Sequence, residues 1–254
     1  LDSAAVAEIA RGRGHTLHPT MAARLTHHTA GNPRDVVALL DELPPGIWRQ
    51  PDARLPAPAA RVTEVAARLE TCTPDARALV CAVAVLGDDQ PIATAVELAG
   101  IEDPLPAVDG AMDAGLLQAL RESGGAATGL RLPDTLTRAA VITTIGVARA
   151  ADAHRRAATI VVDPAARLHH LVAATAVADP ALADALDELA GERGIEGSWA
   201  QAATLLRQAA RLSTDPMLRD QRLTRAVDAL LAAGDCVRAA SLVPAVESLR
   251  ETPL

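Results

Sequence analysis

The segment from Leu25 to Leu43 contains a helix end and a helix start within three consecutive residues. Gly31 can adopt the left-handed conformation that ends a helix, Asn32 can cap the next one, and Pro33 suits its first turn. The following helix carries an apolar stripe, made of Val36, Val37, Leu39, Leu40 and Leu43. The sequence therefore predicts two short helices joined by a tight turn.

Helical patterns dominate the rest of the chain, and its composition favours them. There is no Phe or Tyr, and Trp48 and Trp199 are the only aromatic residues, so Ala, Leu and Val must fill the core. Ala and Leu are the strongest helix formers, and Ala lets helices approach closely. Besides the first segments, helices are predicted at 59–71, 74–86, 92–99 and 104–114. We therefore expect an all-α fold.

One small β-hairpin interrupts the helical patterns. Short apolar runs at 115–120 and 129–132 flank a turn at Ser123-Gly124-Gly125. Helices followed by such a hairpin are typical of a winged helix, which we place at 59–161. A further helix starts near Asp134 and either ends near Ala148 or continues to Val161.

The last part of the chain contains an internal repeat. Residues 197–206 align with residues 234–243 at an offset of 37 residues, and both begin with Gly and a capping residue. This spacing is typical of stacked helix pairs, which form concave binding surfaces. We therefore predict helical repeats over 162–254, separated from the N-terminal helices (1–43) by a proline-rich linker at 44–58 and by the winged-helix unit. Trp48 lies inside the linker and is expected to pin it to a neighbouring domain.

Charge and side-chain chemistry exclude several functions. The net charge is −8, and neither half of the chain has the basic excess of a DNA-binding surface. Cys72, Cys81 and Cys236 lack metal-ligand spacing and are expected to be buried thiols. Adjacent residues on a helix point about 100° apart, so neither His27-His28 nor the pair at 169–170 suits one metal ion. In the second pair we expect one ring to be packed and the other to face outward.

No catalytic constellation, metal motif, signal peptide or membrane-spanning run is visible. We expect a cytoplasmic, non-enzymatic chain that contacts neither membrane nor nucleic acid directly. The turn at 31–34 has two interpretations. Either it only ends one helix and starts the next, or it forms an anion site at a helix N-terminus with Arg34 facing a phosphate.

Several segments together resemble one family. Thr29-Ala30-Gly31-Asn32-Pro33 resembles the lid of AAA-like signal-transducing ATPases of the STAND class, and of large LuxR-type regulators of actinobacteria in particular. The segments 73–87 and 113–117 resemble the winged-helix region of that family. Residues 153–158, 167–171 and 199–210 resemble its entry helices and tetratricopeptide-like repeats. The resemblance covers nearly the whole chain and implies that 1–43 is part of an NTPase lid.

The resemblance also implies a cofactor and partners. It places Gly31, Asn32, Pro33 and Arg34 against ATP or ADP, whose phosphate-binding loop would lie outside residues 1–254 because no GxxxxGK[ST] motif occurs here. The chain alone is expected to hold no cofactor. Its partners would be the nucleotide-binding and DNA-binding domains of the same polypeptide, a protein or small-molecule signal on the repeats, and further copies of itself.

Two functions follow from these patterns. The first is the sensory and regulatory middle region of an ATP-dependent LuxR-type transcriptional regulator, which couples signal binding to nucleotide state and oligomerisation. The family usually has His-Pro after the hairpin, where this chain has Leu132-Pro133-Asp134-Thr135. That departure favours the alternative, a helical-repeat adaptor for protein–protein interaction without nucleotide coupling.

Overall fold

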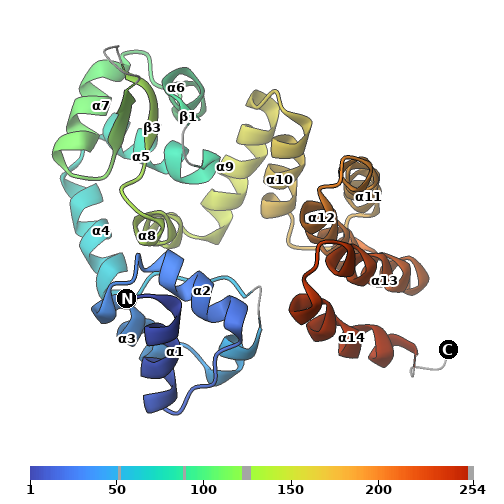
Figure 1. Ribbon diagram of the computed structural model, residues 1–254. Coiled ribbons are helices and arrows are strands. Elements are labelled where there is room, and N and C mark those ends of the chain that lie inside the picture. Colours follow the sequence, from blue (N-terminus) through green and yellow to red (C-terminus); the bar gives the residue numbers. More distant parts are fainter. Residues whose placement is uncertain (51–52, 88–89, 122–126, 251–254) are drawn as a thin grey trace. The chain divides into compact units, whose positions relative to one another are not determined.

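A computed structural model describes residues 1–50, 53–87, 90–121 and 127–250 (Figure 1). The described chain is predominantly α-helical, with one small antiparallel sheet, so the predicted all-α fold is confirmed. It divides into two compact units, Leu1–Ile160 and Val161–Leu254, which are described separately below. The finer division at 43 and 58 remains a prediction from the sequence.

Unit 1 begins with three short helices that pack through their apolar faces. They are α1 (Ser3–Gly12), α2 (Pro19–His28) and α3 (Pro33–Glu42). Asp2 caps α1 by accepting a hydrogen bond from the backbone nitrogen of Ala5 (2.8 Å). The buried residues include Val6, Met21, Leu25, Leu39 and Leu40. The predicted helix–turn–helix at Gly31 is thus present, and α1 covers both of its helices.

The proline-rich segment after α3 contains a short 3₁₀-helix, η1 (Pro45–Arg49), which the sequence pattern did not predict. Trp48 in η1 is fully buried and lies edge-on to the ring of His15, with the ring centroids 6.1 Å apart. The carbonyl oxygen of Trp48 also accepts a hydrogen bond from the backbone nitrogen of His18 (3.0 Å). The tryptophan therefore fastens this segment to the N-terminal helices, as expected.

The rest of unit 1 is arranged around one central helix. The elements are α4 (Ala59–Thr71), α5 (Pro74–Leu86), β1 (Gln90–Pro91), α6 (Ile92–Ala99), α7 (Pro104–Asp113), β2 (Gln118–Arg121), β3 (Ala127–Arg131), α8 (Thr135–Ile145) and α9 (Val147–Ile160). Helix α5 is buried on most sides and is contacted by α6, α7, α8 and α9. Thr73 caps it through a hydrogen bond from the backbone nitrogen of Ala76 (3.2 Å).

The sheet has the strand order β1-β3-β2, and both pairs are antiparallel. The predicted hairpin corresponds to β2 and β3, with Ala119 opposite Leu130. The two-residue strand β1 joins the other side of β3 and was not predicted, because so short a strand has no detectable alternation. The predicted turn at Ser123-Gly124-Gly125 lies outside the described residues.

The helix after the hairpin is shorter than either prediction. It ends at Ile145, and a separate helix begins at Val147. Gly146 between them has a φ of 82° and a ψ of 157°, which is a conformation that only glycine adopts readily. A single glycine therefore ends the helix in a stretch whose composition favours its continuation.

Unit 2 consists of helices that contact their neighbours in chain order. They are α10 (Pro164–Ala174), α11 (Pro180–Ile195), α12 (Trp199–Leu212), α13 (Pro216–Ala232) and α14 (Cys236–Arg250). Gly197 and Gly234 precede α12 and α14 with φ values of 79° and 76°, so the predicted 37-residue offset corresponds to equivalent turns. Alanine side chains fill much of the interface between α11, α12 and α13.

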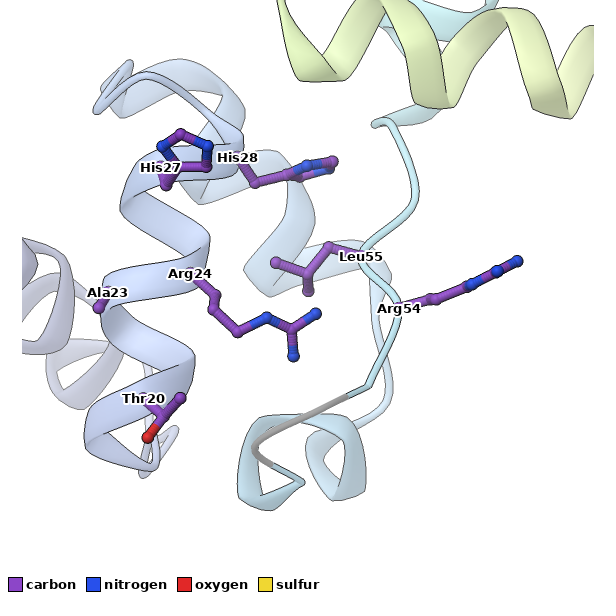
Figure 2. Close-up of a pocket in the computed structure, with 7 residues that line it drawn as sticks. All are labelled: Thr20, Ala23, Arg24, His27, His28, Arg54 and Leu55. Carbon is purple, nitrogen blue, oxygen red and sulfur yellow. The ribbon is translucent and has the colours of Figure 1, made fainter. Parts of the chain in front are cut away.

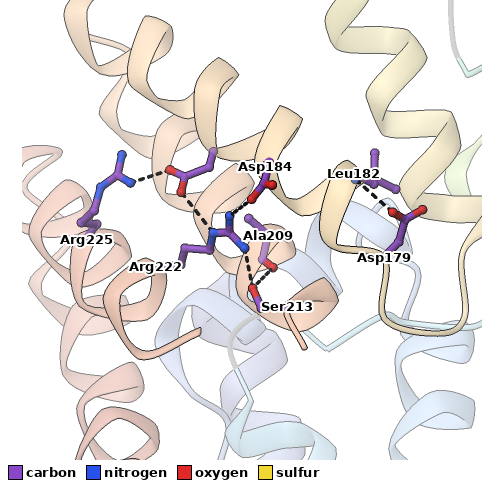
Figure 3. A network of polar contacts seen from close by, with 8 residues as sticks. Asp179, Leu182, Asp184, Ala209, Ser213, Arg222 and Arg225 are labelled. Carbon is purple, nitrogen blue, oxygen red and sulfur yellow. Dashed lines mark hydrogen bonds and ion pairs between the residues drawn. The ribbon is translucent and has the colours of Figure 1, made fainter. Parts of the chain in front are cut away.

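A buried arginine links three elements of unit 2 (Figure 3). Arg222 of α13 is 4% exposed, and its Nε donates to Asp187 of α11 (3.0 Å). Its Nη1 donates to Ser213 Oγ (2.6 Å), and its Nη2 pairs with Asp184 of α11. Ser213 in turn donates to the carbonyl oxygen of Ala209 (2.8 Å). The guanidinium thus fixes α13 against α11 and the end of α12.

The expectation of three buried cysteines is wrong for Cys236. Cys72 is buried and Cys81 is half-buried, whereas Cys236 is exposed at the first position of α14. The apolar neighbour Val237 is exposed as well, so the local apolar context did not indicate burial. Burial raises the pKa of the Cys72 and Cys81 thiols. Separately, no helix within the described ranges has both the length and the apolarity needed to cross a membrane.

Candidate functional site

The predicted nucleotide-lid residues lie at the turn between α2 and α3. Gly31 has a φ of 68°, and its backbone nitrogen donates to the carbonyl oxygen of Thr26 (2.8 Å). Asn32 caps α3 by accepting a hydrogen bond from the backbone nitrogen of Arg34 (3.0 Å). The helix end, the cap and the helix start that the sequence predicts at this turn are therefore all present.

These four residues differ in their accessibility. Asn32, Pro33 and Arg34 are exposed, whereas Gly31 is buried against the backbone of Leu1. A Cβ atom at Gly31 would lie 2.4 Å from the carbonyl oxygen of Leu1, so no larger residue fits. A ligand at this turn would therefore contact the three exposed residues, and Gly31 would act through the shape of the turn.

A groove of about 510 Å³ runs along α2 from Thr20 to His28, beside the proline-rich segment (Figure 2). Its described lining is Thr20, Ala23, Arg24, His27, His28, Arg54 and Leu55. None of the four predicted lid residues is part of that lining. The predicted lid turn is therefore not part of the groove. This groove was not predicted from the sequence.

Two side chains of α2 hold the proline-rich segment in place. Arg24 Nη2 donates to the carbonyl oxygen of Ala53 (2.9 Å), and His28 Nε2 lies 3.0 Å from the carbonyl oxygen of Pro56. Figure 2 shows both side chains directed toward this segment, whereas Arg54 points away from α2. One signal was available in the sequence, because Arg24 and His28 are four residues apart and share a face of the helix.

The electrostatics of the groove follow from these contacts. Burial lowers the pKa of His28, and the nearby charges of Arg24 and His27 add to this effect, although the contact with Pro56 and the charge of Asp134 oppose it. His28 is therefore neutral near pH 7 and donates its Nε2 proton to Pro56. Arg24 and Arg54 give the groove positive charge, and no carboxylate belongs to its described lining. The chemistry suits binding of an anionic group, and no pair of groups is arranged for nucleophilic catalysis.

The segment after the hairpin reaches the end of α2. Asp134 caps α8 by accepting a hydrogen bond from the backbone nitrogen of Thr137 (2.6 Å), and it pairs with Arg61 of α4 (2.8 Å). Thr135 Oγ1 donates to the carbonyl oxygen of His28 (2.7 Å). The start of α8 therefore touches the last residue of α2, immediately before the lid turn. The role of Thr135 was not predicted, because its partner lies 107 residues away in the sequence.

Unit 2 offers two further grooves on different faces of α12. One, of about 650 Å³, is lined by α11, α12 and α13 and includes Trp199, Arg225 and Asp228. The other, of about 450 Å³, is lined by residues of α10, α11, α12 and α14. The predicted asymmetry of the second histidine pair is confirmed, because His170 is buried and His169 is exposed.

The described part of the chain contains no group of three or more His, Cys, Asp or Glu side chains that could hold a metal ion. Comparisons with protein-family models, with curated proteins and with solved structures found no match. Any functional conclusion therefore rests on the residues and geometry described above.

Proposed function

We propose that this chain is the sensory and regulatory middle region of an ATP-dependent LuxR-type transcriptional regulator. In this proposal, Asn32, Pro33 and Arg34 contact ATP or ADP held by a nucleotide-binding domain of the same polypeptide. Signal binding to the repeats of unit 2 changes the nucleotide state and oligomerisation, and a DNA-binding domain is the output. The chain itself acts in the cytoplasm without catalysing a reaction.

The contact between Thr135 and His28 carries this proposal. Through it, the N-terminus of α8 touches the last residue of α2, which lies three residues before the lid turn at Gly31. Asp134 beside it is bound to Arg61, so a displacement of α8 would act on α4 as well. A regulator needs such a link, because a ligand shifts an equilibrium only through contacts that differ between two states.

The test uses the polypeptide encoded by the complete reading frame that contains residues 1–254. Binding of ATP and ADP is measured by isothermal titration calorimetry, and oligomeric state by light scattering with each nucleotide and without. We expect binding, and a mass that depends on the nucleotide. Arg34→Ala should weaken binding about tenfold by removing a charge-assisted hydrogen bond. Arg11→Ala removes another exposed arginine of unit 1 and should leave binding unchanged.

The proposal fails if the complete polypeptide binds neither nucleotide, or if its mass is the same in all three conditions. An effect of Arg34→Ala on nucleotide binding no larger than that of Arg11→Ala would remove the turn at 31–34 from the nucleotide site. Thr135→Val tests the link itself. It should leave nucleotide affinity unchanged while reducing the response of the mass to the nucleotide.

A helical-repeat adaptor without nucleotide coupling is the second candidate. The observation that favours it is the position of Asp134, which stands where the family usually has His-Pro. Its carboxylate is engaged in capping α8 and pairing with Arg61. An adaptor would bind its protein partner with the same affinity in ATP, in ADP and without nucleotide, whereas the regulator would not.

A further inference from the structure

The groove of about 450 Å³ in unit 2 lies along one member of each successive helix pair. It is lined by α10, α12 and α14, together with the C-terminal part of α11. In stacked helix pairs, the equivalent helices share a face, and such faces bind ligands. The volume is within the range of about 300–1,000 Å³ found for small-molecule sites. This groove is therefore a candidate ligand site on the repeats.

The lining combines an apolar base with polar groups at the edge. Leu189 is buried and Leu205 is half-buried, and both belong to the lining. Gln201 and Thr204 are exposed on the same side of α12, and Gln208 is half-buried one turn further on. A ligand with an apolar body and a polar end matches this distribution.

The charge of the lining has one sign. Arg193 and Arg238 are half-buried in it, and no Asp or Glu is among its described residues. Arg193 Nη1 donates to Glu196 (2.6 Å), which lies outside the lining. A guanidinium has five N–H donors in a planar fork, so Arg193 can bind an anion while keeping this contact. The other groove of unit 2 has both Arg225 and Asp228 and lacks this bias.

We propose that this groove binds a small organic anion, with its carboxylate or phosphate on Arg193 and its apolar chain against Leu189 and Leu205. Arg238, whose guanidinium pairs with Asp235 (2.5 Å), borders the same site, and Gln201 and Gln208 offer hydrogen bonds. The inference deepens the proposed sensory role by naming the chemical class of the signal. It rests on that proposal for its biological meaning, whereas the binding itself does not.

The experiment measures binding to the 254-residue chain by isothermal titration calorimetry, with octanoate and octyl phosphate as probes. Octanol tests the apolar body without charge, and acetate tests the charge without the apolar body. We expect one or both anionic probes to bind at least about tenfold more tightly than octanol and acetate, because the site needs both parts. The probe that binds more tightly identifies the head group.

Two variants assign the binding to this groove. Arg193→Gln should weaken binding about tenfold, since it removes the charged donor. Gln201→Glu changes an exposed position and should weaken binding by repulsion, without removing a residue that the core needs. Arg167→Gln is the matched control, because it removes an exposed arginine of α10 outside the groove and should leave binding unchanged. Circular dichroism verifies that each variant is folded.

The inference is overturned if octanol binds as tightly as both anions, if no probe binds, or if neither Arg193→Gln nor Gln201→Glu weakens binding. These outcomes are distinct from failure of the proposed function. Anion binding without any nucleotide response of the complete polypeptide would support the groove and reject the regulator. A nucleotide response without anion binding would support the regulator and reject the anion site in this groove.

Discussion

The two units solve the problem of a core without Phe or Tyr in different ways. Unit 1 surrounds α5 with other helices and a small sheet, and it buries Trp48 completely. Unit 2 stacks each helix on its neighbours in the chain, and six of the eight buried residues in one of its described clusters are Ala. Alanine thus dominates this cluster between α11, α12 and α13, whereas the other described cluster of unit 2 has three Leu among its five buried residues.

The difference shows why a buried charge network occurs in unit 2. An alanine buries little apolar area, so an interface made of Ala gains little free energy per residue and tolerates shifts in register. Arg222 contacts two carboxylates and a hydroxyl on neighbouring helices, which fixes how α13 lies against α11 (Figure 3). Such a network is costly to break, because removal of one partner leaves the others unpaired.

The largest expected effect is that of Trp48→Ala on unit 1. Trp48 is fully buried, so removing its ring leaves a cavity and should lower the free energy of unfolding by about 4 kcal/mol. Urea denaturation followed by far-UV circular dichroism measures this change. Trp199→Ala is the matched control in unit 2. That side chain is 40% exposed, and its removal should cost no more than about 1 kcal/mol. Equal costs would contradict the contrast between the two units.

Arg222→Met should destabilise unit 2 by about 3 kcal/mol, because it leaves Asp187 and Ser213 without their buried partner. Arg225→Met is the control, since Arg225 pairs with the same Asp187 but its side chain is 50% exposed, and it should cost about 0.5 kcal/mol. Fluorescence of Trp199 in a Trp48→Phe background reports unfolding of unit 2, because the chain has no Tyr. If both variants cost the same, the network does not hold the helices together.

Two capping aspartates sharpen the comparison at a smaller scale. Asp134 in unit 1 caps α8 and also binds Arg61, whereas Asp163 in unit 2 caps α10 and is exposed. Asp134→Ala should cost about 2 kcal/mol and Asp163→Ala about 1 kcal/mol, because only the first also breaks a link between helices. Urea denaturation of both variants measures the difference. Arg61→Met should remove most of the additional cost, and a full difference in that background would contradict this explanation.

The smallest effect is a dependence of stability on pH. Burial lowers the pKa of His28 in unit 1 and of His170 in unit 2, and His169 contributes to the second shift. Both imidazoles stay neutral in the folded state, while the unfolded chain takes up protons near pH 6.5. Stability is therefore complete above pH 6.5, falls as the pH decreases through this value, and levels off below the folded pKa. Urea denaturation midpoints between pH 8 and pH 5 measure this dependence of stability on pH.

Single variants assign the pH dependence to each unit. His28→Gln keeps a donor for the carbonyl oxygen of Pro56 but cannot titrate, so it should reduce the dependence in unit 1. His170→Gln should reduce it in unit 2. A dependence that persists unchanged in both variants would assign it to other groups.

The turn between α2 and α3 shows how far local signals reach. Gly31, Asn32 and Pro33 act on residues within one turn of themselves, so the helix end, the cap and the helix start were all predictable. The contact of Thr135 with His28 was not, because it depends on how α8 is placed against α2. The role of Arg222 was likewise not predictable from the sequence. Its spacing on α13 is ordinary, and only the packed neighbours make it a central residue of unit 2.

The sequence by itself determined the all-α class, the hairpin, the repeat offset and most helix boundaries. Each of these follows from short-range preferences of the backbone and from the spacing of apolar residues. Only the tertiary structure decided that Trp48 is buried against His15, that Cys236 is exposed and which side chains line the three grooves. Ala packs against almost any surface, so an Ala-rich helix does not reveal which face is covered. Accessibility depends on neighbours that are far away in the sequence, and folding alone brings them together.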